Sequence, residues 1–229
     1  AFSALNWAQM PIQQSLSDIA TIEPHPPLTY VIFHIWNLVI GGINSPFALR
    51  MLGVLGNLVG IPAMYALVLL MTRHVGLALL AGFMWAVHPF EVWHSQDFRN
   101  YALWAGLSVI ALWLGLRLRR HRSAVDWLLY VGFALVSGLV FYTELLTLGA
   151  LGLWYLMRYR QQRRFIMTFL FVQAFVVVVV LVSFYILQGG LLSSGGYGGN
   201  VEPFRALDYV TRFVPTLILG ETIPQELTR

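Results

Sequence analysis

The sequence contains no cysteine and no lysine, and only 10% of its 229 residues are charged. Without cysteine the chain has no disulfide framework, thiolate metal site or catalytic thiol, and without lysine it has no Schiff-base chemistry. Soluble domains carry about 25% charged residues on average, so this composition excludes an ordinary soluble globule. A disordered chain is excluded as well, because 14% of the residues are aromatic and the apolar runs are long.

Hydrophobic residues make up 58% of the chain, and the mean hydropathy is +0.70. A transmembrane helix needs about 20 mostly apolar residues. The stretches that approach this length are 48–71, 75–87, 101–116, 127–157 and 165–187, and a shorter aromatic-rich run covers 28–40. The sequence therefore predicts an all-α integral membrane protein, with a multi-pass bundle of transmembrane helices over residues 28–187.

Arginine clusters separate the apolar stretches and indicate which loops share one side of the membrane. If the segments 72–74, 117–126 and 158–164 are cytoplasmic loops, that side of the membrane holds nine arginines and one acid, Asp126. The other loops then hold five arginines and eight acids, with Glu144 counted apart. This asymmetry is what the positive-inside rule predicts. Nucleic acid is not the expected partner, because the bases stand in short clusters between apolar runs.

Two segments leave the path of the chain open. Residues 127–157 form either one long helix or a hairpin that turns near 141–144, and we favour the hairpin. Each of its arms has ~15 residues, or ~22 Å of helix, against a hydrocarbon core of ~30 Å. The run 28–40 does not fit a further crossing between two external loops, so it lies along the outer interface or enters the membrane only partway.

We expect the chain to be an internal portion of a longer membrane protein, incomplete at both ends. Residues 1–27 form an external loop with an amphipathic segment, and residues 188–229 form an external loop and its following segment. The latter begins with six glycines in residues 189–200. This run is a linker or a flexible lid; it lacks the Gly-Lys-Ser/Thr ending of a phosphate-binding loop.

The segment Glu23-Pro24-His25-Pro26-Pro27-Leu28 holds the first candidate site. Proline is tolerated in the first turn of a helix, so a helix is predicted to start at Pro26 or Pro27. Its free N–H groups favour an anion such as phosphate. Glu23 and His25 just before it could accept or donate a proton or hold a metal. The alternative is that Glu23 caps the helix dipole and the prolines fix the entry angle.

The segment 91–101 holds the second candidate site, because it packs many polar groups between two spans. Arg99 could bind a phosphate bidentately with Asp97 orienting it, and Gln96 and Tyr101 are further substrate-binding candidates. The alternative is a local capping network around Asp97, with Tyr101 in an interfacial aromatic belt.

Two more candidate residues lie outside these two segments. Arg50 is either a snorkelling anchor or a phosphate ligand. Glu144 is a lone carboxylate at the outer turn of the hairpin, and the hairpin places it at the wall of a cavity.

Three motifs at these spacings resemble bacterial GT-C glycosyltransferases, in the branch similar to protein O-mannosyltransferases and the lipid A aminoarabinose transferase. They are His25-Pro26-Pro27-Leu28, Phe47-Ala48-Leu49-Arg50-Met51-Leu52 and Ser95-Gln96-Asp97-Phe98-Arg99-Asn100-Tyr101-Ala102-Leu103. The resemblance covers roughly residues 1–156. It extends to Phe141-Tyr142-Thr143-Glu144, where Glu144 stands in place of the family's histidine.

The resemblance implies a multi-pass enzyme of the bacterial cytoplasmic membrane. Such enzymes take a sugar from a polyprenyl-phosphate carrier and pass it, with inversion, to an acceptor on the outer face. Their catalytic carboxylate belongs to an Asp-Glu pair commonly followed by Ala, an aromatic residue and Ser. Because this chain begins Ala1-Phe2-Ser3, we expect that pair directly before Ala1. Within the chain, Arg50 and Arg99 are then expected to hold phosphate, Asp97 to orient Arg99, and Glu23 with His25 to shape the site.

The partners that follow are membrane lipid, the lipid-linked sugar donor and an acceptor that is a sugar, a lipid or a protein. No cofactor is obligatory, and although no residue pattern demands a divalent metal, the sequence is compatible with one. A second hypothesis is an accessory or catalytically degenerate subunit that keeps the fold and packs in a membrane complex. A third is a lipid-sugar flippase or transporter, but the sequence has none of the internal repeats typical of that class.

Overall fold

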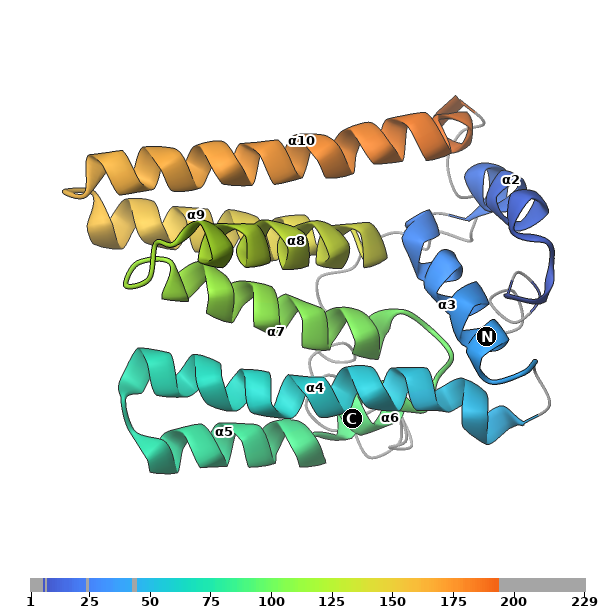
Figure 1. Ribbon diagram of the computed structural model, residues 1–229, viewed down its shortest axis with the longest axis horizontal. Helices are drawn as coiled ribbons and strands as arrows, with labels where there is room; N and C mark the ends of the chain where they lie inside the picture. The colour runs from blue at the N-terminus through green and yellow to red at the C-terminus, as the bar shows by residue number, and fades with distance from the viewer. Residues whose placement is uncertain (1–5, 7, 24, 43–44, 194–229) are drawn as a thin grey trace, which may run out of the picture.

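The structure, a computed structural model, describes residues 6, 8–23, 25–42 and 45–193. Over these ranges all regular secondary structure is helical (Figure 1). The helices are α2 (Ile12–Ile22), α3 (Pro27–Val39), α4 (Pro46–Thr72), α5 (Val75–Val87), α6 (Pro89–Ser95), α7 (Tyr101–Arg117), α8 (Ala124–Val140), α9 (Glu144–Tyr159) and α10 (Arg163–Ser193). The external segment was predicted over 188–229, but its residues 188–193 belong to the end of α10. Residues 194–229, with most of the glycine-rich run, lie outside the described residues.

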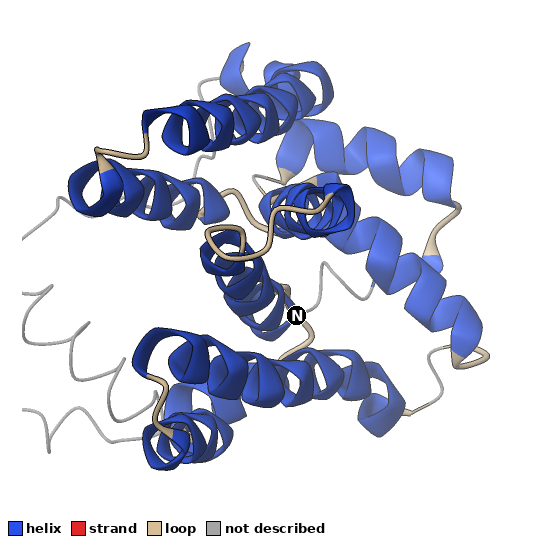
Figure 2. Cartoon of the chain, turned by 60° about the vertical axis from the view of Figure 1, so that its left-hand side comes forward, coloured by secondary structure: helices blue, strands red, loops and turns tan. Residues whose placement is uncertain are grey.

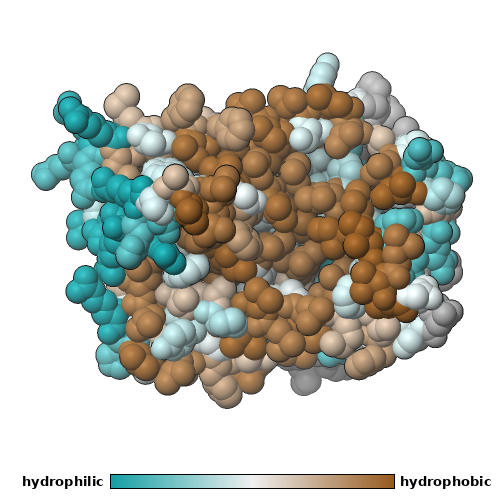
Figure 3. Space-filling model, in the orientation of Figure 1, coloured by the Kyte–Doolittle hydropathy of each residue, from teal (hydrophilic) through white to brown (hydrophobic). Residues whose placement is uncertain are grey.

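Two of the helices are long and apolar enough to cross a membrane. These are α4 over Phe47–Thr72 and α10 over Arg163–Gly189, and a third span results if α5 and α6, bent by 50°, count as one. Apolar side chains form a broad belt across the molecule, with polar side chains at its two ends (Figure 3). The chain is therefore a helical membrane protein, as its composition predicts.

Residues 127–157 form the predicted hairpin and not a single long helix. Helix α8 ends at Val140, Phe141 is extended (φ −154°, ψ 121°), and α9 begins at Glu144. The loops after α4, α7 and α9 all lie at the left-hand end of Figure 1. These loops carry the three arginine clusters, so all nine arginines of the sequence-based assignment gather at one end of the described bundle.

Helix α3 begins at Pro27 with Pro26 as its N-cap, as the prolines predict. With 13 residues it is ~20 Å long, too short to cross a hydrocarbon core of ~30 Å. Helices α2 and α3 lie at the end of the bundle opposite the arginine clusters (Figures 1 and 2). The run 28–40 thus does not form a span of its own in this structure.

Glycines bring the backbones of α4 and α7 into contact. A Cβ atom on Gly106 of α7 would lie 2.3 Å from the carbonyl oxygen of Gly56 on α4. A Cβ atom on Gly56 would lie 2.7 Å from Cα of Leu103. Small residues at helix interfaces allow this close approach in membranes. The contact fixes the start of α7 beside the first half of α4, and both helices carry candidate site residues at that end.

Candidate functional site

A cavity of about 600 Å³ opens at the end of the bundle opposite the arginine clusters. Residues from α4, from α6, from the loop after it and from the start of α7 line this cavity: Arg50, Trp93, His94, Gln96, Asp97, Arg99 and Tyr101. The structure thus brings five sequence-predicted candidates together, and they come from two motifs separated by more than forty residues in the sequence. We call this the two-arginine cavity.

Alternating side chains hold the loop 96–100 in place. Phe98 is buried and stacks on Phe33 of α3, with ring centroids 4.2 Å apart. Asn100 is also buried, and its Nδ2 donates a hydrogen bond to the carbonyl oxygen of Val140 at 3.0 Å. Asp97, just before Phe98, and Arg99, between Phe98 and Asn100, are left at the cavity. The end of α6 and the loop also contact α4, because a Cβ atom on Gly53 would lie 2.7 Å from the carbonyl oxygen of Ser95 and 3.5 Å from that of Asp97.

The charge in the cavity is positive. Nε of Arg99 lies 3.5 Å from Oδ2 of Asp97, and both side chains remain partly exposed, at 46% and 30%. Partial burial lowers the pKa of Arg99. Tyr101, Asp97 and Tyr30 together raise the pKa by more than burial lowers it, so the net shift is upward. Arg50 is exposed and forms no ion pair with any carboxylate among the described residues. Two guanidinium groups against one carboxylate suit an anionic ligand such as a phosphate.

Glu23 and His25 form a pair behind the wall of this cavity. Nδ1 of His25 contacts Oε1 of Glu23, and the backbone N–H of His25 donates to the same oxygen at 3.3 Å. Burial raises the pKa of Glu23, but His25 and Tyr30 lower it below the usual value. The His25 ring stacks on Phe141 at 5.8 Å and meets the edge of Tyr101 at 6.3 Å. His25 therefore touches a lining residue without lining the cavity itself.

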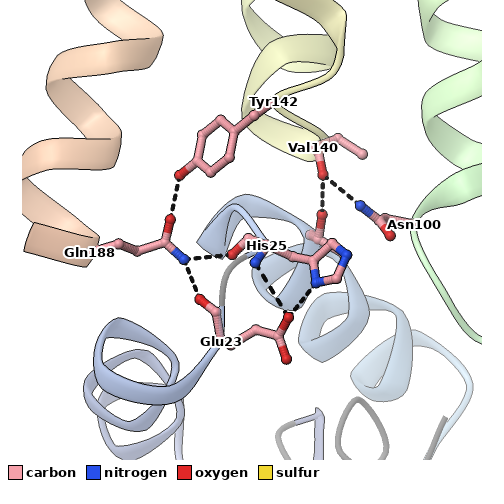
Figure 4. Close-up of polar contacts among 7 residues, drawn as sticks. Glu23, His25, Asn100, Val140, Tyr142 and Gln188 are labelled. Atoms are coloured by element: carbon pink, nitrogen blue, oxygen red, sulfur yellow. Dashed lines mark hydrogen bonds and ion pairs between the residues drawn. The ribbon is translucent and has the colours of Figure 1, made fainter. Parts of the chain in front are cut away.

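Gln188 fixes the backbone of this pair, and the sequence reasoning did not identify it. Its Nε2 donates to the carbonyl oxygens of Glu23 and of His25, the latter at 2.8 Å. Its Oε1 accepts a hydrogen bond from the Tyr142 hydroxyl at 2.6 Å (Figure 4). Gln188 is completely buried at a kink in α10, where its backbone is not helical (φ −128°, ψ 15°). A polar residue at the end of a long apolar run was the signal for it.

Glu144 lies at the outer turn of the hairpin but does not line the two-arginine cavity. It is completely buried, and its Oε2 accepts a hydrogen bond from Nε1 of Trp104 at 3.0 Å. Its Oε1 has no hydrogen-bond partner among the described residues. The hydroxyl groups of Ser108 and Ser137 lie beside the carboxylate. The structure thus places Glu144 in the packing of α7, α8 and α9, and not at the cavity wall.

The start of α3 opens into a different, apolar cavity of about 300 Å³. Residues of α2, α3, α8, α10 and the hairpin turn line it: Leu16, Pro27, Leu28, Val31, Leu139, Tyr142, Ser183 and Leu187. The proline-started helix end and the two arginines therefore line different cavities, although Phe33 of α3 stacks on Phe98 and the His25 ring meets the edge of Tyr101. The predicted use of the α3 end as part of an arginine-lined anion site is not supported by this placement.

Among the described residues there is no group of three or more His, Cys, Asp or Glu side chains that could hold a metal ion. A scan against protein-family models and searches of curated proteins and of solved structures found no match to this chain.

Proposed function

We propose that this chain is the membrane portion of a GT-C-type glycosyltransferase. It moves a sugar from a polyprenyl-phosphate donor to an acceptor on the exoplasmic side of the bacterial cytoplasmic membrane, with inversion. The observation that carries this proposal is the two-arginine cavity, which lies at the end away from the arginine clusters. By the positive-inside rule that end is exoplasmic, and a lipid-borne phosphate reaches its membrane surface.

The chemistry requires positive charge where the leaving group forms. The acceptor hydroxyl oxygen bonds to the anomeric carbon, the bond from that carbon to the phosphate oxygen breaks, and polyprenyl phosphate leaves with an added negative charge. Arg50 and Arg99 supply guanidinium groups to stabilise this anion. Asp97, 3.5 Å from Arg99, orients it, and Gln96 and Tyr101 complete the wall of the cavity.

The proton of the acceptor hydroxyl needs a carboxylate base within hydrogen-bond reach. Asp97 is the one carboxylate that lines the two-arginine cavity in the described part of the chain, and Arg99 already pairs with it. Glu23 is engaged with His25 behind the wall. The family resemblance implies an Asp-Glu pair directly before Ala1, and we propose that pair as the base.

The test is sugar transfer by the full-length protein in vesicles, with a panel of radiolabelled polyprenyl-phosphate sugars as donors. In Arg99→Ala the turnover should fall about 100- to 1000-fold, the range for loss of one charge-stabilising donor. Arg160→Ala removes an exposed arginine from the opposite end and should leave turnover unchanged. Unchanged turnover in Arg99→Ala would rule out the assignment of Arg99 to the donor phosphate.

A second function is an accessory subunit that keeps the fold without catalysis. The observation that favours it is the lack of an unpaired carboxylate on the cavity wall within the described ranges. The residues encoded just upstream of Ala1 decide between the two. An Asp-Glu pair there whose replacement by Asn-Gln abolishes transfer supports the enzyme, whereas its absence supports the subunit.

A further inference from the structure

A second arginine-lined hollow lies at the opposite end of the bundle, and the proposed transferase does not use it. It has a volume of about 130 Å³ and lies where the ends of α4, α7 and α9 meet. Arg119 and Arg120, just after α7, contribute the charge, and Trp154 and Tyr159 of α9 contribute aromatic rings. We call it the headgroup hollow.

The two arginines of the headgroup hollow lack acidic partners among the described residues, unlike Arg117 at the end of α7. Arg117 pairs with Asp126 at 3.2 Å. The Arg119 guanidinium lies over the Tyr159 ring, 4.8 Å from its centroid, and Arg120 is exposed. No carboxylate among the described residues forms an ion pair with either of them. Within the described part of the chain, Asp126 is the one acid at this end and Arg117 already pairs with it, so the described carboxylates leave the charge on Arg119 and Arg120 uncompensated.

The other side of the hollow is apolar and belongs to the membrane belt. Leu70 and Met71, in the last turn of α4, and Leu116 of α7 line it. Met71 is 61% exposed on the molecular surface. A ligand here meets cations on the loop side and hydrocarbon on the membrane side. A free phosphate gains nothing from the apolar wall, whereas the acyl chain of a phospholipid can pack against it.

We propose that the headgroup hollow binds one acidic phospholipid from the leaflet at the arginine-rich end. Arg119 and Arg120 bind its phosphate, Trp154 and Tyr159 flank the polar headgroup, and an acyl chain follows Leu70, Met71 and Leu116 into the belt. Charge complementarity selects an acidic lipid over a zwitterionic one, since basic pockets between transmembrane helices bind anionic headgroups. This assignment is independent of the proposed function, because it uses none of the cavity residues at the other end.

The test is native mass spectrometry of the purified full-length protein released from nanodiscs that contain equal amounts of phosphatidylglycerol and phosphatidylcholine. The unsubstituted protein should retain phosphatidylglycerol in preference to phosphatidylcholine. The double substitution Arg119→Gln with Arg120→Gln should lower that retention roughly thirtyfold, because each arginine near an acidic lipid adds attraction. The matched control, Arg160→Gln with Arg164→Gln, removes the same charge from the same end outside the hollow and should change retention less than about twofold.

A second pair of variants keeps every arginine in place. Met71→Asp adds a negative charge to the apolar wall of the hollow and should lower retention. Met157→Asp, at a similarly exposed methionine outside the hollow, should not. Equal losses in the two arginine doubles, unchanged retention in Met71→Asp, or competition by soluble glycerol phosphate as effective as that by phosphatidylglycerol would each overturn the proposal.

Discussion

Glu144 is a buried carboxylate that lies away from the two-arginine cavity, between helices of the bundle. The hairpin places it at the outer turn, as the sequence predicts, but its side chain turns inward between helices. A buried carboxylate costs free energy unless hydrogen bonds satisfy it. The indole N–H of Trp104 supplies one such bond, and the hydroxyl groups of Ser108 and Ser137 are close. We therefore interpret Glu144 as a residue that holds α7, α8 and α9 together.

Glu144→Gln should change the thermal stability of the detergent-solubilised protein little, because a glutamine oxygen still accepts the Trp104 hydrogen bond. Glu144→Leu leaves that indole N–H buried without an acceptor, which costs about 1–3 kcal/mol. Thermal unfolding monitored by fluorescence measures both. In Trp104→Phe the donor is absent, so the added cost of Glu144→Leu should shrink. Equal losses in Glu144→Gln and Glu144→Leu would contradict this interpretation.

The residue types in the sequence identified side chains that line the cavity, but they did not identify Gln188, which holds the backbone behind its wall. An ionisable side chain inside a membrane span or at the mouth of a cavity is costly to bury, which is why Arg50 and Arg99 stand out in the sequence, and the two do line one cavity. Gln188 was missed because its role depends on the carbonyl oxygens of Glu23 and His25, which reach it only in the folded chain. Backbone acceptors carry no signature in a sequence.

At the scale of elements, the path of the helices was largely predictable and their contacts were not. The arginine clusters predicted the α8–α9 hairpin, and the prolines at 26 and 27 predicted the start of α3 to within one residue. The close approach of α4 and α7 was not predicted, because glycine is common in membrane helices and a close contact requires glycine on both partners. Gly56 and Gly106 meet this condition, whereas Gly132 and Gly149 face open space.

Gly106→Ala should destabilise the protein by about 1–3 kcal/mol, the usual cost of overpacking. The added methyl group would lie 2.3 Å from a backbone oxygen of α4, so the two helices must separate. Gly132→Ala is the matched control in α8, where no atom lies within 4 Å of the new methyl group, and it should stabilise by up to about 1 kcal/mol. Thermal unfolding in detergent compares them, and equal effects at the two positions would refute the close contact.

For the whole molecule, the separation of charge between the two ends predicts how the chain lies in the bilayer. The absence of cysteine allows single cysteines to report on sidedness without background labelling. In membrane vesicles, His121→Cys and Gln161→Cys should react with an impermeant maleimide from the same side. Both positions are exposed at the arginine-rich end.

Thr143→Cys, at the hairpin turn between α8 and α9, should react from the other side. Labelling of positions 121 and 161 from opposite sides would require one continuous helix through the membrane and would contradict the hairpin. The composition of the chain predicts membrane insertion, and its charge pattern predicts the sidedness. The orientation of α2 and α3 across the end of the bundle depends on tertiary packing, so the sequence did not predict it.

The hydrogen bonds of Gln188 also determine when the site is completed during synthesis. This amide joins the Glu23 and His25 carbonyl groups to α10 across 165 and 163 residues of sequence. Helices α4 to α9 can pair as they leave the ribosome, since each packs on neighbours made shortly before or after it. Among the described residues, the Glu23 and His25 carbonyl groups accept their side-chain hydrogen bonds from Gln188. The backbone at Glu23 and His25 therefore reaches its final arrangement only when translation has passed residue 188 and α10 has inserted.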